Sequence, residues 1–142
     1  MRVLGIDLGR KRIGVAVSDR SGTIASPLTV MARGRSQRED HTAIAALVRE
    51  EEATMVVVGL PLNMDGTEGA SARSARLEVE RMATVVGVPV VLHDERRTTV
   101  QADRVLMDRN VGARERRSEV DKVAAAFILQ SWLDGQRASD GG

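Results

Sequence analysis

Apolar and polar residues alternate at the start of the chain, which is the pattern of β-strands with one buried face. The alternation predicts strands at residues 2–7, 12–19 and 23–32. Gly9 supplies the backbone freedom for the first turn. Pro27 cannot donate to a central ladder, so the third strand is expected at a sheet edge or at a bulge. Three strands joined by short turns are most simply antiparallel.

The apolar spacing then becomes helical. Residues 37–52 and 72–86 carry apolar side chains at intervals of three and four, which predicts two helices. Residues 54–60 and 88–92 are continuous apolar runs, typical of strands covered on both faces. His41 falls in the first of these helices, where we expect it to be exposed.

The C-terminal part is more polar. Residues 98–108 look helical, 109–117 form a basic loop, and 118–133 return to helical spacing. The small polar residues 135–142 predict a flexible tail.

This order of elements predicts an α/β fold. Three antiparallel strands followed by two strand–helix crossovers give a five-stranded mixed sheet, with a meander, two parallel strands and helices on both faces. With 142 residues, the chain fits one domain at 1–134 followed by the tail at 135–142. Sites in such sheets gather beyond the carboxyl ends of the strands.

Composition narrows the class of ligand. There is no cysteine, which excludes disulfides and thiolate metal sites. Of 21 basic residues only Lys11 and Lys122 are lysines. Arginine is the usual residue for gripping phosphodiesters, although a genome rich in G and C explains the bias equally well. Phe127 and Trp132 are the only aromatic residues, so nucleic-acid binding would depend on backbone charge and shape rather than base stacking.

Membrane and export signals are weak in this sequence. The longest apolar run, residues 55–62, is far shorter than the roughly 18 residues of a membrane span. Asp7 and the basic residues at 10–12 interrupt any apolar signal segment. We therefore expect a cytoplasmic protein without a membrane partner.

Three carboxylates come at positions where they could meet. Asp7 ends the first strand, Glu95 follows the fifth, and Asp121 lies in the first turn of the last predicted helix. If the first and fifth strands are parallel in the centre of the sheet, Asp7 and Glu95 leave the same edge. Convergent acids repel one another unless a cation shares the site, and Mg²⁺ or Mn²⁺ suits oxygen ligands. Two such ions about 3.5–4 Å apart would activate water against a phosphodiester.

Each acid also has a simpler explanation. Asp7 suits an ordinary turn after a strand, and Glu95 suits a solvated stretch of charged residues. Ser118 and Asp121 have the spacing of a capping box, in which the acid closes the first turn of the helix. We assign no catalytic task to His41 or to His93, which we place at a strand end.

Four segments together resemble the YqgF family, also called RuvX, of ribonuclease H-like fold. They are Gly5-Ile6-Asp7-Leu8-Gly9 with Arg12-Ile13-Gly14-Val15-Ala16, Val58-Gly59-Leu60-Pro61-Leu62-Asn63-Met64-Asp65-Gly66 with Glu68-Gly69, Asp94-Glu95-Arg96 with Thr98-Thr99 and Ala102, and Val120-Asp121-Lys122-Val123-Ala124-Ala125. The resemblance implies a metal-dependent nuclease with acids matching Asp7, Glu95 and Asp121. It further implies a task in maturing the 5′ end of the 16S ribosomal RNA precursor, or, in an older attribution, resolution of four-way DNA junctions.

The resemblance also suggests residues for substrate binding beside the acids. Loop residues Asn63, Asp65 and Thr67 would contact substrate, unless the loop is simply a turn before the next helix. The basic residues that flank the acids would neutralise phosphates, namely Arg10, Lys11, Arg12, Arg96 and Arg97. A second basic cluster would extend this track or remain solvated, namely Arg114, Arg116 and Arg117.

Two other classes of protein share parts of the pattern. A strand ending in Asp7-x-Gly9 also resembles the actin-like ATPases and sugar kinases, but the chain has no room for their second lobe. An RNA-binding protein of the same fold would keep the arginines without cutting. A junction resolvase ordinarily requires a two-fold dimer, and the sequence leaves monomer and homodimer open.

Overall fold

A computed structural model describes the backbone of residues 1–96 and 113–141 and the side chains of residues 1–96 and 121–137. Its strands are β1 (Val3–Leu8), β2 (Arg12–Ser18), β3 (Ala25–Ala32), β4 (Met55–Leu60) and β5 (Val90–Asp94). Its helices are α1 (Gln37–Glu50), α2 (Ala70–Ala83) and α4 (Ala113–Gly141). None of the helices in these ranges is long and apolar enough to cross a membrane.

The five strands form one mixed sheet in the order β3-β2-β1-β4-β5. The first three are antiparallel, while β4 is parallel to both β1 and β5. This confirms the predicted meander with two parallel strands. The pairing of β2 with β3 shifts beside Pro27, and β3 is an edge strand, as the proline predicted.

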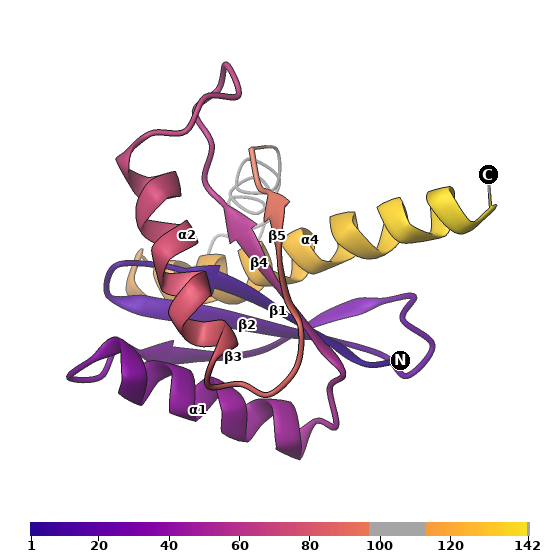
Figure 1. Cartoon of the computed structure of the whole chain (residues 1–142), viewed down its shortest axis with the longest axis horizontal. Coiled ribbons are helices and arrows are strands. Elements are labelled where there is room, and N and C mark those ends of the chain that lie inside the picture. Colours follow the sequence, from indigo (N-terminus) through magenta and orange to yellow (C-terminus); the bar gives the residue numbers. More distant parts are fainter. Residues whose placement is uncertain (97–112, 142) are drawn as a thin grey trace.

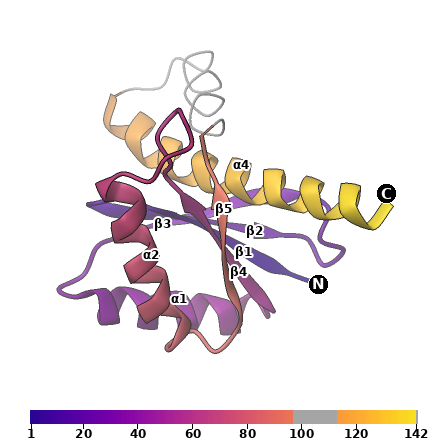
Figure 2. The same ribbon diagram turned by 45° about the horizontal axis from the view of Figure 1, so that its top comes forward.

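Helices cover both faces of the sheet (Figures 1 and 2). Large side chains such as Ile6, Val15 and Val58 pack with Ile44 of α1 and Met82 of α2 on one face. The other face presents smaller residues to α4, and its core is Val3, Ala16, Val57, Ala125, Ile128, Leu129 and Leu133. Because successive strand residues point to opposite faces, neighbouring residues at a strand end serve different sides of the molecule.

One expectation about position was wrong. β5 lies at an edge of the sheet rather than in its centre, because β4 intervenes between β1 and β5. The carboxyl ends of β1 and β5 still share one edge, since the three strands run parallel. The predicted helix at 98–108 lies outside the described residues.

The last helix differs from the prediction at both ends. α4 begins at Ala113, so the second half of the expected basic loop is helical. It also continues through the expected tail to Gly141. A single Gly135 costs a helix only about 1 kcal/mol, and Asp134 forms an ion pair with Arg137 one turn later. The proposed domain boundary at residue 134 stays a prediction, but the residues beyond it do not leave the helix.

Candidate active site

Asp7 stands at the end of β1 on the α4 face. Burial raises the pKa of its carboxyl to about 6, and the negative charge of Asp121 adds to the rise. Within the described residues, no hydrogen-bond donor or cation is paired with this carboxylate. A partly buried acid without a partner is unfavourable in its charged form. The Asp7 carboxylate is therefore suited to bind a cation that the described residues do not supply.

Glu95 follows β5 and is held by its backbone, whose N–H donates to the Leu60 carbonyl at 3.2 Å. Its side chain lies over Gly59 of the neighbouring β4. A Cβ at position 59 would come within 2.3 Å of Glu95 Oε2, so only glycine leaves this space. Burial raises the pKa of Glu95 to about 7, with further contributions from the charges of Asp7 and Asp94.

Asp121 reaches the same region from α4. Gly14, the cross-strand partner of Asp7, makes this possible, because a Cβ there would lie 2.0 Å from the Asp121 carbonyl oxygen. The Asp121 carboxylate accepts a hydrogen bond from Arg12 Nε at 2.8 Å. The capping-box explanation is wrong, since α4 begins at Ala113 and residues 118–121 lie in its interior.

The acids are therefore close enough for their charges to matter: that of Asp121 raises the pKa of Asp7, and that of Asp7 raises the pKa of Glu95. The three carboxylates are not arranged as a ready metal site. Among the described residues, no group of three or more His, Asp or Glu side chains is placed to hold a metal ion. The hydrogen bond from Arg12 engages one Asp121 oxygen. A divalent ion would have to compete with this arginine for Asp121.

The loop between β4 and α2 is held mainly by its own side chains. Asn63 Nδ2 donates to Thr67 Oγ1 at 3.0 Å, and the Thr67 hydroxyl and N–H both donate to Asp65 Oδ1, at 2.6 and 2.9 Å. The bonds from Thr67 lower the pKa of Asp65. Arg96 ties the loop to the end of β5 by donating to the Met64 carbonyl at 3.4 Å. This bonding supports the simple turn, and the substrate role of these residues stays a prediction.

The predicted basic residues have different surroundings. Arg10 and Lys11 are exposed in the turn between β1 and β2, with no side-chain partner among the described residues. Arg12 is engaged by Asp121, and Arg96 by Asp94, with 2.6 Å between Nη2 and Oδ2. Arg97 lies outside the described residues. The backbone at Arg114, Arg116 and Arg117 is helical rather than a loop.

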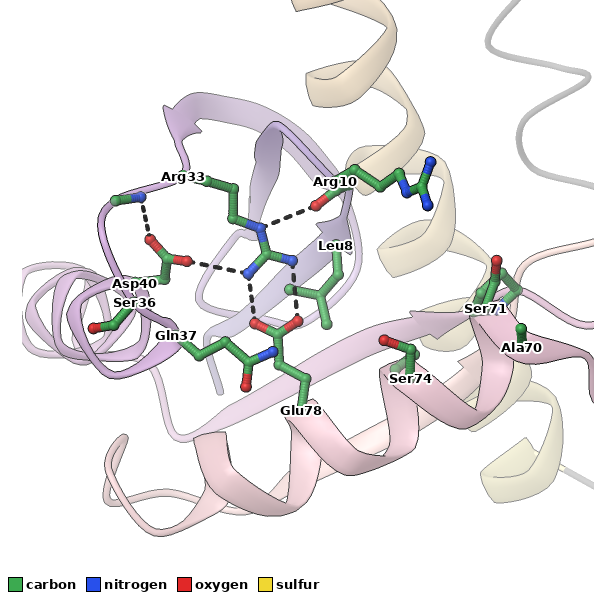
Figure 3. A pocket seen from close by; sticks show the side chains of 14 residues that line it. Leu8, Arg10, Arg33, Ser36, Gln37, Asp40, Ala70, Ser71, Ser74 and Glu78 are labelled. Carbon is green, nitrogen blue, oxygen red and sulfur yellow. Dashed lines mark hydrogen bonds and ion pairs between the residues drawn. The ribbon is translucent and has the colours of Figure 1, made fainter.

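Sequence reasoning missed a second charged cluster, formed by Arg33, Asp40, His41 and Glu78 on the α1/α2 face. Figure 3 shows Arg33, Asp40 and Glu78 of this cluster. Arg33 binds Glu78 through both terminal nitrogens, at 2.6 and 3.0 Å, and Asp40 at 3.1 Å. His41 Nε2 lies 2.9 Å from Glu78 Oε2. The expectation of an exposed His41 was wrong, because its side chain is 1% exposed.

The match to known proteins spans nearly the whole chain. A family model described as "RuvX: Holliday junction resolvase" matches residues 1–135. The chain belongs to the RuvX family. The resemblance noted in the sequence is thereby confirmed.

Curated relatives in this family carry a different functional name. A protein of Anaeromyxobacter sp. (strain Fw109-5) is 54% identical over 138 residues, covering 97% of this chain and 100% of its own length. A protein of Myxococcus xanthus (strain DK1622) is 49% identical over 140 residues, covering 99% of this chain and 92% of its own length. Both are named "Putative pre-16S rRNA nuclease".

Solved structures support the predicted fold class. RuvC of T. thermophilus, solved in complex with a Holliday junction substrate, superposes with a TM-score of 0.61 at 20% identity, covering 98% of this chain and 97% of that one. A second structure of Thermus thermophilus RuvC superposes with a TM-score of 0.53 at 19% identity, covering 99% of this chain and 97% of that one. At this identity the likeness shows the fold alone, and it confirms the ribonuclease H-like architecture.

Proposed function

We propose that this RuvX-family chain is a divalent-metal-dependent endonuclease that matures the 5′ end of the 16S ribosomal RNA precursor. The relatives named as pre-16S rRNA nucleases support the substrate. The observation that carries the chemistry is the partly buried carboxylate of Asp7, which has no partner among the described residues and whose pKa, like that of Glu95, is raised. Such a protein would act in the cytoplasm, where this precursor is made.

The donor set fits Mg²⁺ or Mn²⁺. Asp7 and Glu95 offer carboxylate oxygens, which hard divalent ions prefer, and the charge of Asp7 raises the cost of ionising Glu95. A cation between them would reverse that cost. Asp121 would supply the third carboxylate after exchanging Arg12 for the ion. When bound, the ions would activate a water molecule and stabilise the leaving oxygen of the phosphodiester.

The remaining residues would position the substrate. Arg10 and Lys11 are exposed at the same sheet edge as Asp7 and have no side-chain partner in the part of the chain that the structure describes, so they can neutralise backbone phosphates. Arg12, once released from Asp121, would join them. The loop between β4 and α2 would contact the substrate through Asn63, Asp65 and Thr67. Arg96 holds this loop against the end of β5. The scarcity of aromatic side chains suits recognition of a folded RNA through its backbone.

A metal-titrated cleavage assay on the ribosomal RNA precursor tests this proposal. We expect cutting by the unmodified chain in Mg²⁺ or Mn²⁺ and a loss of at least about a thousandfold in Asp7→Asn, because a ligand to the activating ion is gone. RNA binding should persist in that variant. Equal cutting by both proteins would refute the catalytic assignment.

Two other functions are decided by the same assay. A four-way DNA junction offered beside the RNA tests the resolvase function, which the family description favours. Symmetric cutting of the junction by a two-fold dimer would support that function over RNA maturation. RNA binding without cutting in any metal would instead indicate a non-catalytic RNA-binding protein. Whether the chain is a monomer or a homodimer stays a prediction for this measurement.

A further inference from the structure

A cavity of about 630 Å³ opens on the α1/α2 face, behind the acids (Figure 3). Its walls come from the ends of β1 and β4, the segment before α1, and the first turns of α2. Leu8 lines it, while the preceding residue, Asp7, belongs to the acid site on the opposite face. Consecutive Cα atoms are about 3.8 Å apart. The cavity and the acids are therefore separated by the thickness of one strand.

The two ends of the cavity differ in charge. At one end Arg33 donates to Glu78, Asp40 and the Gly9 carbonyl, and the two carboxylates balance its charge. At the other end, Arg10 lines the cavity together with Ser71 and Ser74 of α2 (Figure 3). None of these three side chains has a hydrogen-bond or ion-pair partner among the described residues. As far as the described residues go, the cavity therefore presents one free cation and two free hydroxyls.

The floor between these polar groups is apolar. Leu8, Pro61 and Ala75 line it. Ligand sites of about 300–1,000 Å³ hold small molecules with an apolar body and a few polar contacts. One nucleotide has this character, with a planar base, a ribose hydroxyl and a phosphate. A base-paired duplex does not fit such a volume.

We propose that this cavity holds one unpaired nucleotide of the RNA strand, next to the phosphodiester that the acids cut. Its phosphate pairs with Arg10, its base rests on Leu8 and Pro61, and Ser71 and Ser74 bind its polar edge. The strand thus crosses the end of β1, with the scissile phosphate on one side and its neighbour on the other. The cavity requires a single-stranded segment flanking the cut. This inference rests on the proposed nuclease function and specifies its substrate.

The test fills the cavity without touching the acids. Ser74 is exposed on α2, so Ser74→Leu adds bulk at the cavity without disturbing the core. Ala83→Leu adds similar bulk at an exposed position near the other end of the same helix. Binding of a labelled short single-stranded RNA is measured by fluorescence anisotropy with EDTA present, which removes any contribution from metal. We expect Ser74→Leu to weaken binding about tenfold, the equivalent of about 1.4 kcal/mol, and Ala83→Leu to leave it within about twofold.

A second measurement locates the nucleotide. Adenosine 5′-monophosphate added to the full chain should shift the backbone amide NMR signals of Leu8, Ser71 and Ser74, and Ser74→Leu should abolish these shifts. Equal RNA binding by Ser74→Leu and the unmodified chain, or shifts confined to other amides, would overturn the cavity assignment. The cleavage assay tests the nuclease function separately. If Ser74→Leu loses RNA binding but the unmodified chain does not cut the precursor, the nucleotide site is supported and the nuclease function is rejected.

Discussion

Two clusters of charged side chains lie near the same edge of the sheet, on opposite faces. On the α1/α2 face, Arg33 joins Glu78, Asp40 and the Gly9 carbonyl through its donors, at 2.6 to 3.1 Å. On the α4 face, Asp7 has no such partner among the described residues, and Asp121 is paired through one bond from Arg12. Among the described residues, the charges of the first cluster are balanced by one another, whereas the charge of Asp7 in the second cluster is not.

The pKa values follow from this difference. Burial alone would raise the pKa of Glu78, but hydrogen bonds and charge from Arg33 and His41 outweigh it, so the pKa is lowered. Those of Asp7 and Glu95 are raised, since burial and neighbouring acids act in the same direction. The paired cluster therefore holds α1, α2 and the β2–β3 end of the sheet together. In the acid cluster, the raised pKa values of Asp7 and Glu95 mean that ionising these groups costs stability, which is characteristic of a functional site.

The largest effect is expected in the paired cluster. Glu78→Gln removes the charge that binds Arg33 and His41 and leaves a buried cation poorly compensated. Breaking a buried pair on one side typically costs about 3–5 kcal/mol. We expect the free energy of unfolding, measured by urea titration, to fall by about 3 kcal/mol.

Glu80→Gln is the matched control, because Glu80 is exposed on the same helix. It should change the free energy of unfolding by less than about 0.5 kcal/mol. Similar losses in both variants would mean that the Arg33–Glu78 pair contributes nothing specific.

The opposite sign is expected in the acid cluster. Asp7→Asn removes an unfavourable buried charge, so at pH 8 the variant should be more stable than the unmodified chain. The rise in the pKa of Asp7 from 3.8 to about 6 corresponds to about 1–3 kcal/mol once partial solvent exposure is allowed for. Differential scanning calorimetry should show a melting temperature higher by about 5 °C, in a protein that no longer cuts.

The gain in stability of Asp7→Asn depends on pH, because the pKa of Asp7 differs between the folded and the unfolded chain. Between pH 3.8 and about 6 the folded chain binds more protons at Asp7 than the unfolded chain, so stability falls as pH rises through this window. The advantage of Asp7→Asn should therefore vanish near pH 4 and reach its full size above pH 6. Asp19→Asn is the contrasting control: hydrogen bonds from Thr23 and Ser21 lower the pKa of Asp19 to about 2, so losing that charge should lower the melting temperature. A destabilised Asp7→Asn at pH 8 would contradict the account.

Periodicity was sufficient to predict much of this fold. The alternation around Val15 and the continuous run of β4 define their strands without tertiary information. The carboxyl-end rule then predicted that Asp7 and Glu95 would share an edge. It succeeded although β5 is not central, because parallel strands keep their ends together.

The remaining features depend on contacts that no local pattern encodes. Arg33 and Glu78 are 45 residues apart, and each alone looks like a solvated charge. Gly14 and Gly59 are the signals that were available, since glycine inside a strand often marks a close approach. They mark the positions where Asp121 and Glu95 lie in close contact with the sheet. Arg12 was predicted to bind phosphate, and only the structure pairs it with Asp121.

The smallest effect is expected at the ion pair between Arg12 and Asp121. This pair is the feature of the acid cluster that most resembles the cluster around Arg33. Arg12→Gln frees the Asp121 carboxylate, so an incoming metal ion no longer competes with a guanidinium. A partly exposed pair is worth about 1 kcal/mol or less, which predicts up to about fivefold tighter Mn²⁺ binding by isothermal titration calorimetry. Lys11→Gln removes the same charge from an exposed neighbour that has no partner among the described residues, and it reports the general effect of lowering positive charge. If both variants tighten Mn²⁺ binding equally, the Arg12–Asp121 pair does not restrain metal entry. If only Arg12→Gln does, Arg12 holds the site closed until a cation replaces it.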